Sequence, residues 1–460
     1  MHARAIGKFL CRCNILVRLP GTVLPRLRKM PSESRPANNG GSVVSMSTLS
    51  SKTTALIERE EKFGAHNYGP IPVVITRGKG VKVWDVDGKE YYDFLAAYSA
   101  VNQGHCHPRI LKAMTDYASI LTLTSRAFYN DKLGAYEEYV TKLFGYDKLL
   151  PMNTGVEAAE TAVKLARRWG YEVKLIPENQ AKVVFAEGNF WGRSLAAVSS
   201  STDKSSYGGF GPYMPNFEVI PYNDVHAVEI CDVIRLSFQH ALHDHNVCAF
   251  MVEPIQGEAG VVVPDDDYLK KVRKICDDRN VLLICDEIQT GLGRTGRRLC
   301  CDHWGVRPDI VTLGKALSGG FYPVSCVLAD DPVMLVIGRG QHGSTYGGNP
   351  LACVVATEAI KVLEEEGLYE NAERIGTILG DGLRRLPTSK VTTVRGKGMM
   401  WAVVMDPKYN AWEASLRLME NGILCKPTHG DTIRFTPPLV ITEAEMRDAV
   451  ERIWKTFDGL

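Results

Sequence analysis

Groups that could do chemistry follow several apolar runs of strand length in this chain. Asp286 ends the run VLLICD, Lys315 comes two residues after DIVTL, and Glu253 follows CAFMV. The turn PMNTG at 151–155 precedes an Ala- and Glu-rich helical stretch, whose first backbone N–H groups could bind a phosphate. Ligands of open parallel sheets bind beyond the carboxyl ends of the strands, so we expect these groups to meet at one sheet edge.

A lysine, a carboxylate at the end of a buried strand and an anion site are what pyridoxal 5′-phosphate (PLP) needs. The amine of Lys315 would condense with the cofactor's aldehyde, and Asp286 would keep the ring nitrogen protonated. A buried carboxylate is costly unless a positive group meets it, and a protonated ring would do so. In NFWGR, which follows another apolar run, Phe190 and Trp191 are both available to cover the ring. The pattern therefore predicts a PLP site.

The segment GLGRTG offers a competing interpretation, because it formally matches the G-x-G-x-x-G of dinucleotide-binding proteins. That fingerprint needs its first glycine directly after the strand and a helix after its third. Here five residues separate the strand from Gly291, and RRLCCDH follows Gly296. The spacing therefore disfavours a nicotinamide site. Glu287 points to the opposite strand face from Asp286, so we expect it to serve as a structural hydrogen-bond partner.

The elements that must position these groups alternate between strands and helices. Apolar runs predict strands at 182–186, 248–252, 281–285, 309–313 and 324–328. Helical patterns such as 268–279 lie between several of them, which predicts an α/β fold with a mostly parallel sheet. After residue 350, two long helical patterns, short strands and a terminal helix at 442–457 predict a smaller α+β unit.

Composition restricts the function further. The 460 residues are 45% hydrophobic and 23% charged, with a net charge of +1, which argues against a dedicated nucleic-acid or membrane-surface binder. None of the twelve cysteines lies in a C-x-x-C motif. This scattered distribution is typical of reduced thiols. His105 with His107, and His243 with His245, lack supporting ligands, so no metal site is expected.

The first 31 residues are rich in arginine and contain no acidic residue, so they resemble a mitochondrial transit peptide. We therefore expect residues 1–53 to form a targeting leader and flexible linker, and the protein to reside in the mitochondrial matrix. Translation starting at Met30 or Met46 would instead leave it cytoplasmic. The stretch 228–246 is about ten residues longer than expected. Its apolar spacing fits an amphipathic surface helix, and an error in the gene model is an equal alternative.

Several motifs together resemble the class III, fold-type I PLP-dependent aminotransferases: DEIQTGLGRTG, TLGKALSGG, VEPIQGEAG, NTGVEAAE, NFWGR and HGSTYGGNP. The resemblance implies a large PLP-binding domain at 98–350, built on a mostly parallel, seven-stranded type of sheet. It also implies a smaller α+β domain drawn from both chain ends, 54–97 and 351–460.

The resemblance also implies roles for individual residues. Lys315 would bond to PLP and then act as the general base, and Asp286 would pair with the ring nitrogen. A stacking ring, an amide on the ring hydroxyl and phosphate-binding groups would complete the site: Phe190, Gln289, Gly155, Val156, Ser344 and Thr345. Thr345 would reach the phosphate in the neighbouring subunit, which implies a homodimer, a dimer of dimers or a higher assembly.

The stretches GAHNYGPIPV, YSAVNQGHCHP, LTLTSRAFYN and KPTHGDTIRFTPPLVI are similar to the members of this class that act on ornithine. The δ-amino group of L-ornithine would pass to 2-oxoglutarate in ping-pong order, giving glutamate 5-semialdehyde, which cyclises to pyrroline-5-carboxylate, and L-glutamate. Tyr68 and Arg193 would hold ornithine's α-carboxylate, and Tyr98 would shape that pocket. Arg434 would bind 2-oxoglutarate bidentately, and Glu258 would cover it during the first half-reaction.

Two alternatives stay open at this point. One is an acetylornithine- or 4-aminobutyrate-type aminotransferase of the same class, against which Tyr68 and Tyr98 count. The other is a catalytically inactive relative that serves as a scaffold. The presence of Lys315, Asp286 and Gln289 together argues against it.

Overall fold

The computed structural model describes residues 49–229 and 244–460. The expected leader and most of the expected linker lie outside the described residues, as does the greater part of the stretch 228–246. Helix α8, Val225–Glu229, is the described beginning of that stretch. Residues 51–53, expected in the linker, form the first turn of helix α1, Ser51–Phe63, with Ser50 as its N-cap.

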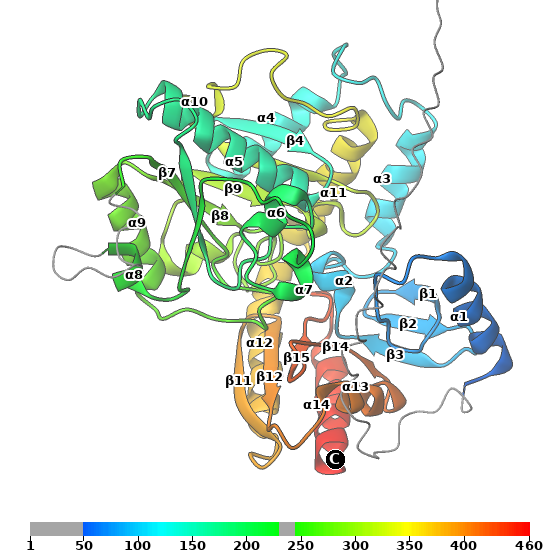
Figure 1. The fold of residues 1–460 in the computed structure, drawn as a ribbon. Coiled ribbons are helices and arrows are strands. Elements are labelled where there is room, and N and C mark those ends of the chain that lie inside the picture. The colour runs from blue at the N-terminus through cyan, green and yellow to red at the C-terminus, as the bar shows by residue number, and fades with distance from the viewer. Residues whose placement is uncertain (1–48, 230–243) are drawn as a thin grey trace, which may run out of the picture. The chain divides into compact units, whose positions relative to one another are not determined.

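A seven-stranded sheet forms the centre of the large unit (Figure 1). Its strands, in spatial order, are β4 (Lys148–Met152), β10 (Ser325–Ala329), β9 (Ile310–Leu313), β8 (Leu282–Asp286), β7 (Val247–Val252), β5 (Lys182–Ala186) and β6 (Phe217–Ile220). From β9 to β6 all neighbours are parallel, whereas β10 runs antiparallel to both of its neighbours. The mostly parallel sheet predicted from the apolar runs is confirmed.

Helices cover both faces of this sheet, and the side chains of β7 show why. Ala249 and Met251 pack in the apolar cluster that contains helix α5, Gly155–Glu172. Phe250 and Val252 point to the opposite face, into the cluster that contains α9, Tyr268–Arg279. A strand buried on both faces is apolar along its whole length, which explains the unbroken runs in the sequence.

Other helices of the large unit are α3 (Pro108–Ala118), α4 (Leu133–Phe144) and α11 (Pro350–Glu365). Short helices of four or five residues are α2 (Ala96–Ser99), α6 (Leu195–Ser199), α7 (Lys204–Tyr207) and α10 (Asp331–Met334). Two 3₁₀ turns lie at Cys300–Trp304 and Lys315–Ser318. Helix α11, which we expected at the start of the smaller C-terminal domain, contacts α3 and α4 of the large unit.

The smaller unit contains two four-stranded sheets. One has the order β1 (Ile75–Lys79), β2 (Lys82–Asp85), β3 (Glu90–Asp93) and β13 (Ile423–Leu424), so it joins segments from both ends of the chain. The other has the order β11 (Val391–Lys397), β12 (Met400–Met405), β15 (Thr432–Phe435) and β14 (Lys426–Thr428). Helices α12 (Leu368–Arg384), α13 (Ala411–Glu420) and α14 (Glu443–Asp458) pack with these sheets.

Arg294, in the GLGRTG loop after β8, ties the large unit to the smaller one. Its side chain is fully buried, and Nη1 donates to the carbonyls of Met399, at 3.0 Å, and Pro437, at 2.6 Å. Nη2 donates to Asn102 Oδ1. Burial lowers the pKa of the guanidinium to about 9. The loop that resembled a dinucleotide fingerprint therefore holds an arginine clamp between segments far apart in sequence.

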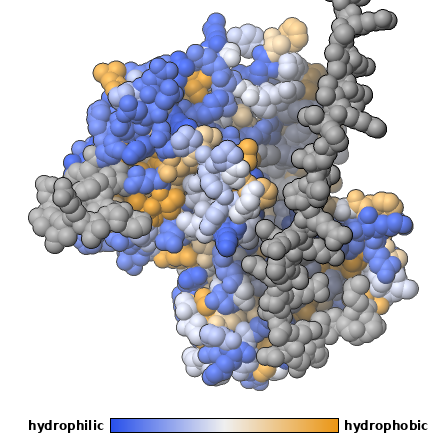
Figure 2. All heavy atoms as spheres, in the orientation of Figure 1, coloured by the Kyte–Doolittle hydropathy of each residue, from blue (hydrophilic) through white to orange (hydrophobic). Residues whose placement is uncertain are grey.

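Hydrophilic side chains cover most of the face shown in Figure 2, and hydrophobic ones occur there in separate patches. Among the described residues, every helix is too short or too polar to cross a membrane.

Candidate active site

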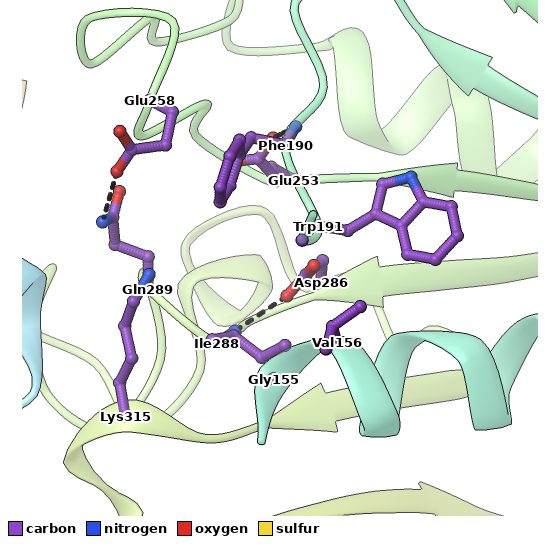
Figure 3. A pocket seen from close by; sticks show the side chains of 11 residues that line it. Gly155, Val156, Phe190, Trp191, Glu253, Glu258, Asp286, Ile288, Gln289 and Lys315 are labelled. Carbon is purple, nitrogen blue, oxygen red and sulfur yellow. Dashed lines mark hydrogen bonds between the residues drawn. The ribbon is translucent and has the colours of Figure 1, made fainter. Parts of the chain in front are cut away.

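A cavity of about 250 Å³ lies where β5, β7, β8 and β9 end and helix α5 begins. Figure 3 shows the side chains that surround it. Its lining consists of Gly155, Val156, Phe190, Trp191, Gly192, Glu253, Glu258, Asp286, Ile288, Gln289 and Lys315. The sheet edge thus brings together the lysine, the carboxylates and the helix N-terminus that the sequence predicted would meet.

Asp286 is the last residue of β8 and is 4% exposed. One carboxylate oxygen accepts hydrogen bonds from the Ile288 N–H at 3.0 Å and from Thr312 Oγ1 at 3.1 Å. Burial raises the pKa of this carboxyl to about 6, while the Lys315 ammonium opposes that rise. A cation that entered the cavity would stabilise the ionised form, which is what a protonated pyridine ring requires.

Lys315 follows β9 at the start of a 3₁₀ turn, and its backbone has a φ of +46°. Burial lowers the pKa of its ammonium, and Glu258, Asp286 and Glu253 partly counteract this effect. A lower pKa increases the share of neutral amine, which is the nucleophilic and basic form. The left-handed backbone aims the lysine from the strand end and is a conformation that side chains other than glycine seldom adopt.

The N-terminus of α5 offers the anion site. A capping box joins Thr154 and Glu157: the Glu157 N–H donates to Thr154 Oγ1 at 3.4 Å, and Glu157 Oε2 accepts from the Thr154 N–H at 2.7 Å. Gly155 and Val156, in the first turn, belong to the cavity wall, and first-turn N–H groups have no intrahelical partner. They could therefore bind a phosphate, aided by the helix dipole.

The GSTYGG segment lies next to this turn but outside the cavity. Asn153 Nδ2 donates to Ser344 Oγ at 2.8 Å, which fixes the segment near the start of α5. Thr345 is exposed. Neither Ser344 nor Thr345 belongs to the wall of the cavity as the described residues form it.

Gln289 provides a test of whether PLP fits here. Its Nε2 lies 3.4 Å from both the Tyr98 carbonyl and Glu258 Oε1, whereas its Oε1 is buried without a hydrogen-bond partner among the described residues. A buried amide oxygen of this kind needs a donor, and the hydroxyl of a pyridine ring would supply one. The donor set, from Asp286 to the α5 N-terminus, therefore fits the cofactor.

Glu253 joins the site although the sequence only placed it near Glu258 without a role. Its two carboxylate oxygens accept from the Phe190 N–H at 2.9 Å and the Gly257 N–H at 3.1 Å. Burial, with the nearby Asp286 carboxylate, raises its pKa to about 8. Glu253 thus holds both the loop that carries Phe190 and the loop that leads to Glu258. Its place directly after a buried strand was the signal that could have identified it.

Glu258 and Arg434 form an ion pair between the large unit and strand β15. Arg434 Nη1 lies 2.8 Å from Oε1 and Nη2 lies 3.3 Å from Oε2, so the contact is bidentate. Although burial alone would raise it, the pKa of Glu258 is lowered because the guanidinium stabilises the carboxylate. The Tyr98 ring packs against Arg434, with its centroid 5.1 Å from the guanidinium carbon. The pairing expected from the sequence is present.

Arg193 and Tyr68 lie away from the lysine. Arg193 lines an adjoining polar cavity of about 350 Å³, together with Glu258, and its guanidinium carbon is 5.4 Å from the Phe190 ring centroid. Tyr68 is 76% exposed and belongs to the wall of neither cavity in the described chain. The structure therefore brings Arg193 next to the site but leaves Tyr68 at the surface.

Glu287 faces away from the cavity. Its carboxylate accepts from Thr290 Oγ1 at 2.5 Å and from the Cys301 N–H at 2.8 Å, in agreement with the structural role expected. His105 Nε2 lies 2.7 Å from the Asp93 carboxylate, so His105 makes a local contact with this carboxylate.

Comparisons with known proteins extend over both units. The family model described as aminotransferase class-III matches residues 63–457. The mitochondrial ornithine aminotransferase of Drosophila melanogaster is 61% identical over 424 residues, which cover 90% of this chain and 96% of that protein. The crystal structure of the Toxoplasma gondii ornithine aminotransferase has a TM-score of 0.86 at 50% identity, with 90% of this chain and 96% of that one covered. The acetylornithine aminotransferase from Elizabethkingia anophelis has a TM-score of 0.79 at 51% identity, with 89% and 99% covered.

Proposed function

Because this chain belongs to the class III aminotransferases, a PLP-dependent family, we propose that it transfers the δ-amino group of L-ornithine to 2-oxoglutarate. The products are glutamate 5-semialdehyde, which cyclises to pyrroline-5-carboxylate, and L-glutamate. The observation that carries the proposal is the ion pair between Glu258 and Arg434 beside the lysine cavity. A covered arginine lets a distal amine react first, and the same arginine, once uncovered, receives the α-carboxylate of a 2-oxo acid.

The chain's own residues account for cofactor binding. When bound, PLP supplies an aldehyde that accepts the amino group and a protonated ring that withdraws electrons. Asp286 would hold the ring nitrogen, Gln289 the ring hydroxyl, and Phe190 one face of the ring. Gly155 and Val156 would hold the phosphate through their N–H groups.

Lys315 would perform two tasks. Its neutral amine, favoured by burial, would bond to the cofactor's aldehyde and be released when the substrate amine replaces it. The freed Nζ would then take a proton from the substrate carbon that carries the amino group and deliver it to the carbon that the cofactor's aldehyde supplied, so that the amino group would stay with the cofactor. The cavity around it is lined by apolar side chains and by the buried carboxylates of Glu253 and Asp286.

The two substrates would use different carboxylate sites. For ornithine, the α-carboxylate would lie at Arg193 in the adjoining cavity, with Tyr98 between the two sites, and Tyr68 would close over it. For 2-oxoglutarate, Glu258 would swing away so that Arg434 binds the α-carboxylate bidentately. The two half-reactions therefore share one cofactor and one lysine but not one carboxylate subsite.

We further propose that the enzyme is a homodimer, or a larger assembly built from dimers, in the mitochondrial matrix. The exposed Thr345, held close to the α5 N-terminus through Ser344, is suited to reach a partner's phosphate site. The basic, acid-free first 31 residues and the mitochondrial relative from Drosophila melanogaster support this location.

Isotope tracing tests the function. L-Ornithine carrying ¹⁵N at the δ-position should give labelled L-glutamate from 2-oxoglutarate, whereas α-labelled ornithine should give unlabelled glutamate. The second candidate is an acetylornithine aminotransferase, favoured by the similarity to the Elizabethkingia anophelis enzyme. Turnover of N-acetylornithine or 4-aminobutyrate at a rate equal to that of ornithine would contradict the proposal.

A further inference from the structure

The hairpin β14–β15 contacts Glu258 at two separate points. Arg434, on β15, pairs with the side chain. The main-chain carbonyl of Glu258 accepts hydrogen bonds from Thr428 Oγ1 at 3.1 Å and His429 Nε2 at 2.9 Å. A carbonyl oxygen only accepts, so the Nε2 of His429 carries a proton, and both lone pairs of the carbonyl are used. One hairpin thus holds the backbone of Glu258 and presents the arginine that its carboxylate covers.

The hairpin is built so that these contacts stay in register. Thr428 pairs with Thr432, and Lys426 pairs with Arg434, so the donors and the arginine belong to one antiparallel ladder. His429 has a φ of +51°, a left-handed conformation that places its ring over the Glu258 carbonyl at the turn. Thr428 and His429 line the adjoining polar cavity and do not belong to the wall that contains Lys315, in the part of the chain described.

The position of the Glu258 backbone determines how well its carboxylate covers Arg434. A Glu258 backbone that is held in place keeps the carboxylate at high effective concentration near the guanidinium. A mobile backbone would lower that effective concentration. Resting on the function proposed above, we infer that Thr428 and His429 are positioning residues that form a latch on the Glu258 main chain. The latch keeps Arg434 covered while ornithine reacts, and it confines the later opening to rotation of the Glu258 side chain.

The double variant Thr428→Val with His429→Gly removes both donors from the holoenzyme. Valine keeps the shape of threonine, and glycine accepts the left-handed backbone. The change in cofactor absorbance on adding ornithine alone, or glutamate alone, gives kcat/KM for each amino donor. We expect the ornithine-to-glutamate ratio to fall about tenfold, because Arg434 is uncovered more often and admits the α-carboxylate of glutamate. A ratio within twofold of the wild-type value would overturn the latch.

A matched control keeps the donors. Thr428→Ser with His429→Gln retains a hydroxyl and an N–H at similar reach, and should restore the ratio to within about twofold of wild type. The single variant Thr428→Val, a milder change, should shift the ratio in the same direction by a smaller factor. An equal loss in the donor-retaining control would show that packing, and not the two hydrogen bonds, sets the ratio, and would also overturn the latch.

A binding measurement separates the latch from the proposed substrate. Glutarate carries two carboxylates but neither an amino nor an oxo group, so it can occupy Arg434 without reacting. Calorimetry should show glutarate binding several-fold more tightly to Thr428→Val with His429→Gly than to wild type, since the fraction of uncovered Arg434 rises. Unchanged glutarate affinity would refute the latch. Failure of the wild type to react with ornithine would refute the proposed function. The glutarate affinities would still test the latch, because glutarate binds at Arg434 without reacting.

Discussion

The amide of Gln289 occupies the space beside Gly257, where an added Cβ would lie 1.4 Å from Gln289 Oε1. This contact explains why the loop between Glu253 and Glu258 has a glycine at this point. It also joins two groups of the site, because Gln289 would bind the ring hydroxyl while Gly257 leads directly to the residue that covers Arg434.

Gly257→Ala should therefore displace Gln289 and weaken cofactor binding. Overpacking of a buried contact costs about 1–3 kcal/mol, which corresponds to a roughly 5- to 150-fold loss of PLP affinity. Titration of the cofactor-free protein with PLP measures it. Gly134→Ala, in α4 where an added Cβ meets nothing within 4 Å, is the matched control and should leave the affinity unchanged. Equal affinities in all three proteins would contradict the packing argument.

The cofactor-free protein should lose stability as the pH rises from 6.5 to 8. Burial raises the pKa of Glu253 to about 8 and that of Glu287 to about 7. Between about pH 5 and its own folded-state pKa, each carboxyl is ionised in the unfolded chain but protonated in the fold. The folded state therefore binds more protons up to about pH 7 at Glu287 and up to about pH 8 at Glu253. Stability then decreases as pH rises, by up to about 1.4 kcal/mol per pH unit for each such group.

Thermal unfolding of the wild type and of Glu253→Gln across this pH range checks the expectation. Glutamine cannot ionise and retains an oxygen for the N–H groups of Phe190 and Gly257. Its melting temperature should therefore decline less steeply with pH than that of the wild type. Parallel curves for the two proteins would show that Glu253 does not titrate in this window.

Replacing Arg434 should separate the two half-reactions. Arg434→Lys keeps a charge but loses bidentate geometry, so reaction of the amino-loaded enzyme with 2-oxoglutarate should slow about 100-fold. The half-reaction with ornithine should change less than fivefold, because we propose that Arg193, and not Arg434, holds ornithine's α-carboxylate. Single-turnover absorbance measurements with each substrate give both rates. An equal loss in both half-reactions would mean that the two substrates share Arg434.

Arg294→Met should destabilise the protein without touching the cavity. The substitution keeps most of the side-chain volume but leaves the Met399 and Pro437 carbonyls without their donor, at a cost of about 3 kcal/mol or more. Chemical denaturation measures the loss. Arg297→Met removes an arginine that is half exposed and whose side chain, within the described part of the chain, has a 3.4 Å ion-pair contact with Glu373, so it should change stability by less than about 1 kcal/mol. Similar losses in both variants would contradict the clamp.

Much of the large unit was predictable, because buried parallel strands are apolar along their whole length. The predicted strand 182–186 and helix 268–279 coincide with β5 and α9. Since parallel strands end at one sheet edge, the positions of Asp286 and Lys315 after their strands were enough to place them in one cavity. The order of residues along the chain and the parallel topology were together sufficient to predict that Asp286 and Lys315 meet.

Contacts between segments far apart in the chain were not predictable from patterns. Arg294 looked like part of a dinucleotide loop, and only the folded chain shows its bonds to carbonyls more than 100 residues away. The grip of Thr428 and His429 on Glu258 likewise depends on how β14 meets the loop after β7. Glu253 was noticed by its place after a strand, but its two N–H partners depend on loop geometry.

The visible absorption spectrum of the purified holoenzyme, recorded before and after adding L-ornithine without a 2-oxo acid, tests the central claim most directly. We expect a cofactor band that bleaches with ornithine, returns on addition of 2-oxoglutarate, and is shifted in Lys315→Ala, which should not turn over. A band that ornithine leaves unchanged would contradict the assigned substrate. A protein that forms no band even with added PLP would contradict the roles of Lys315 and Asp286.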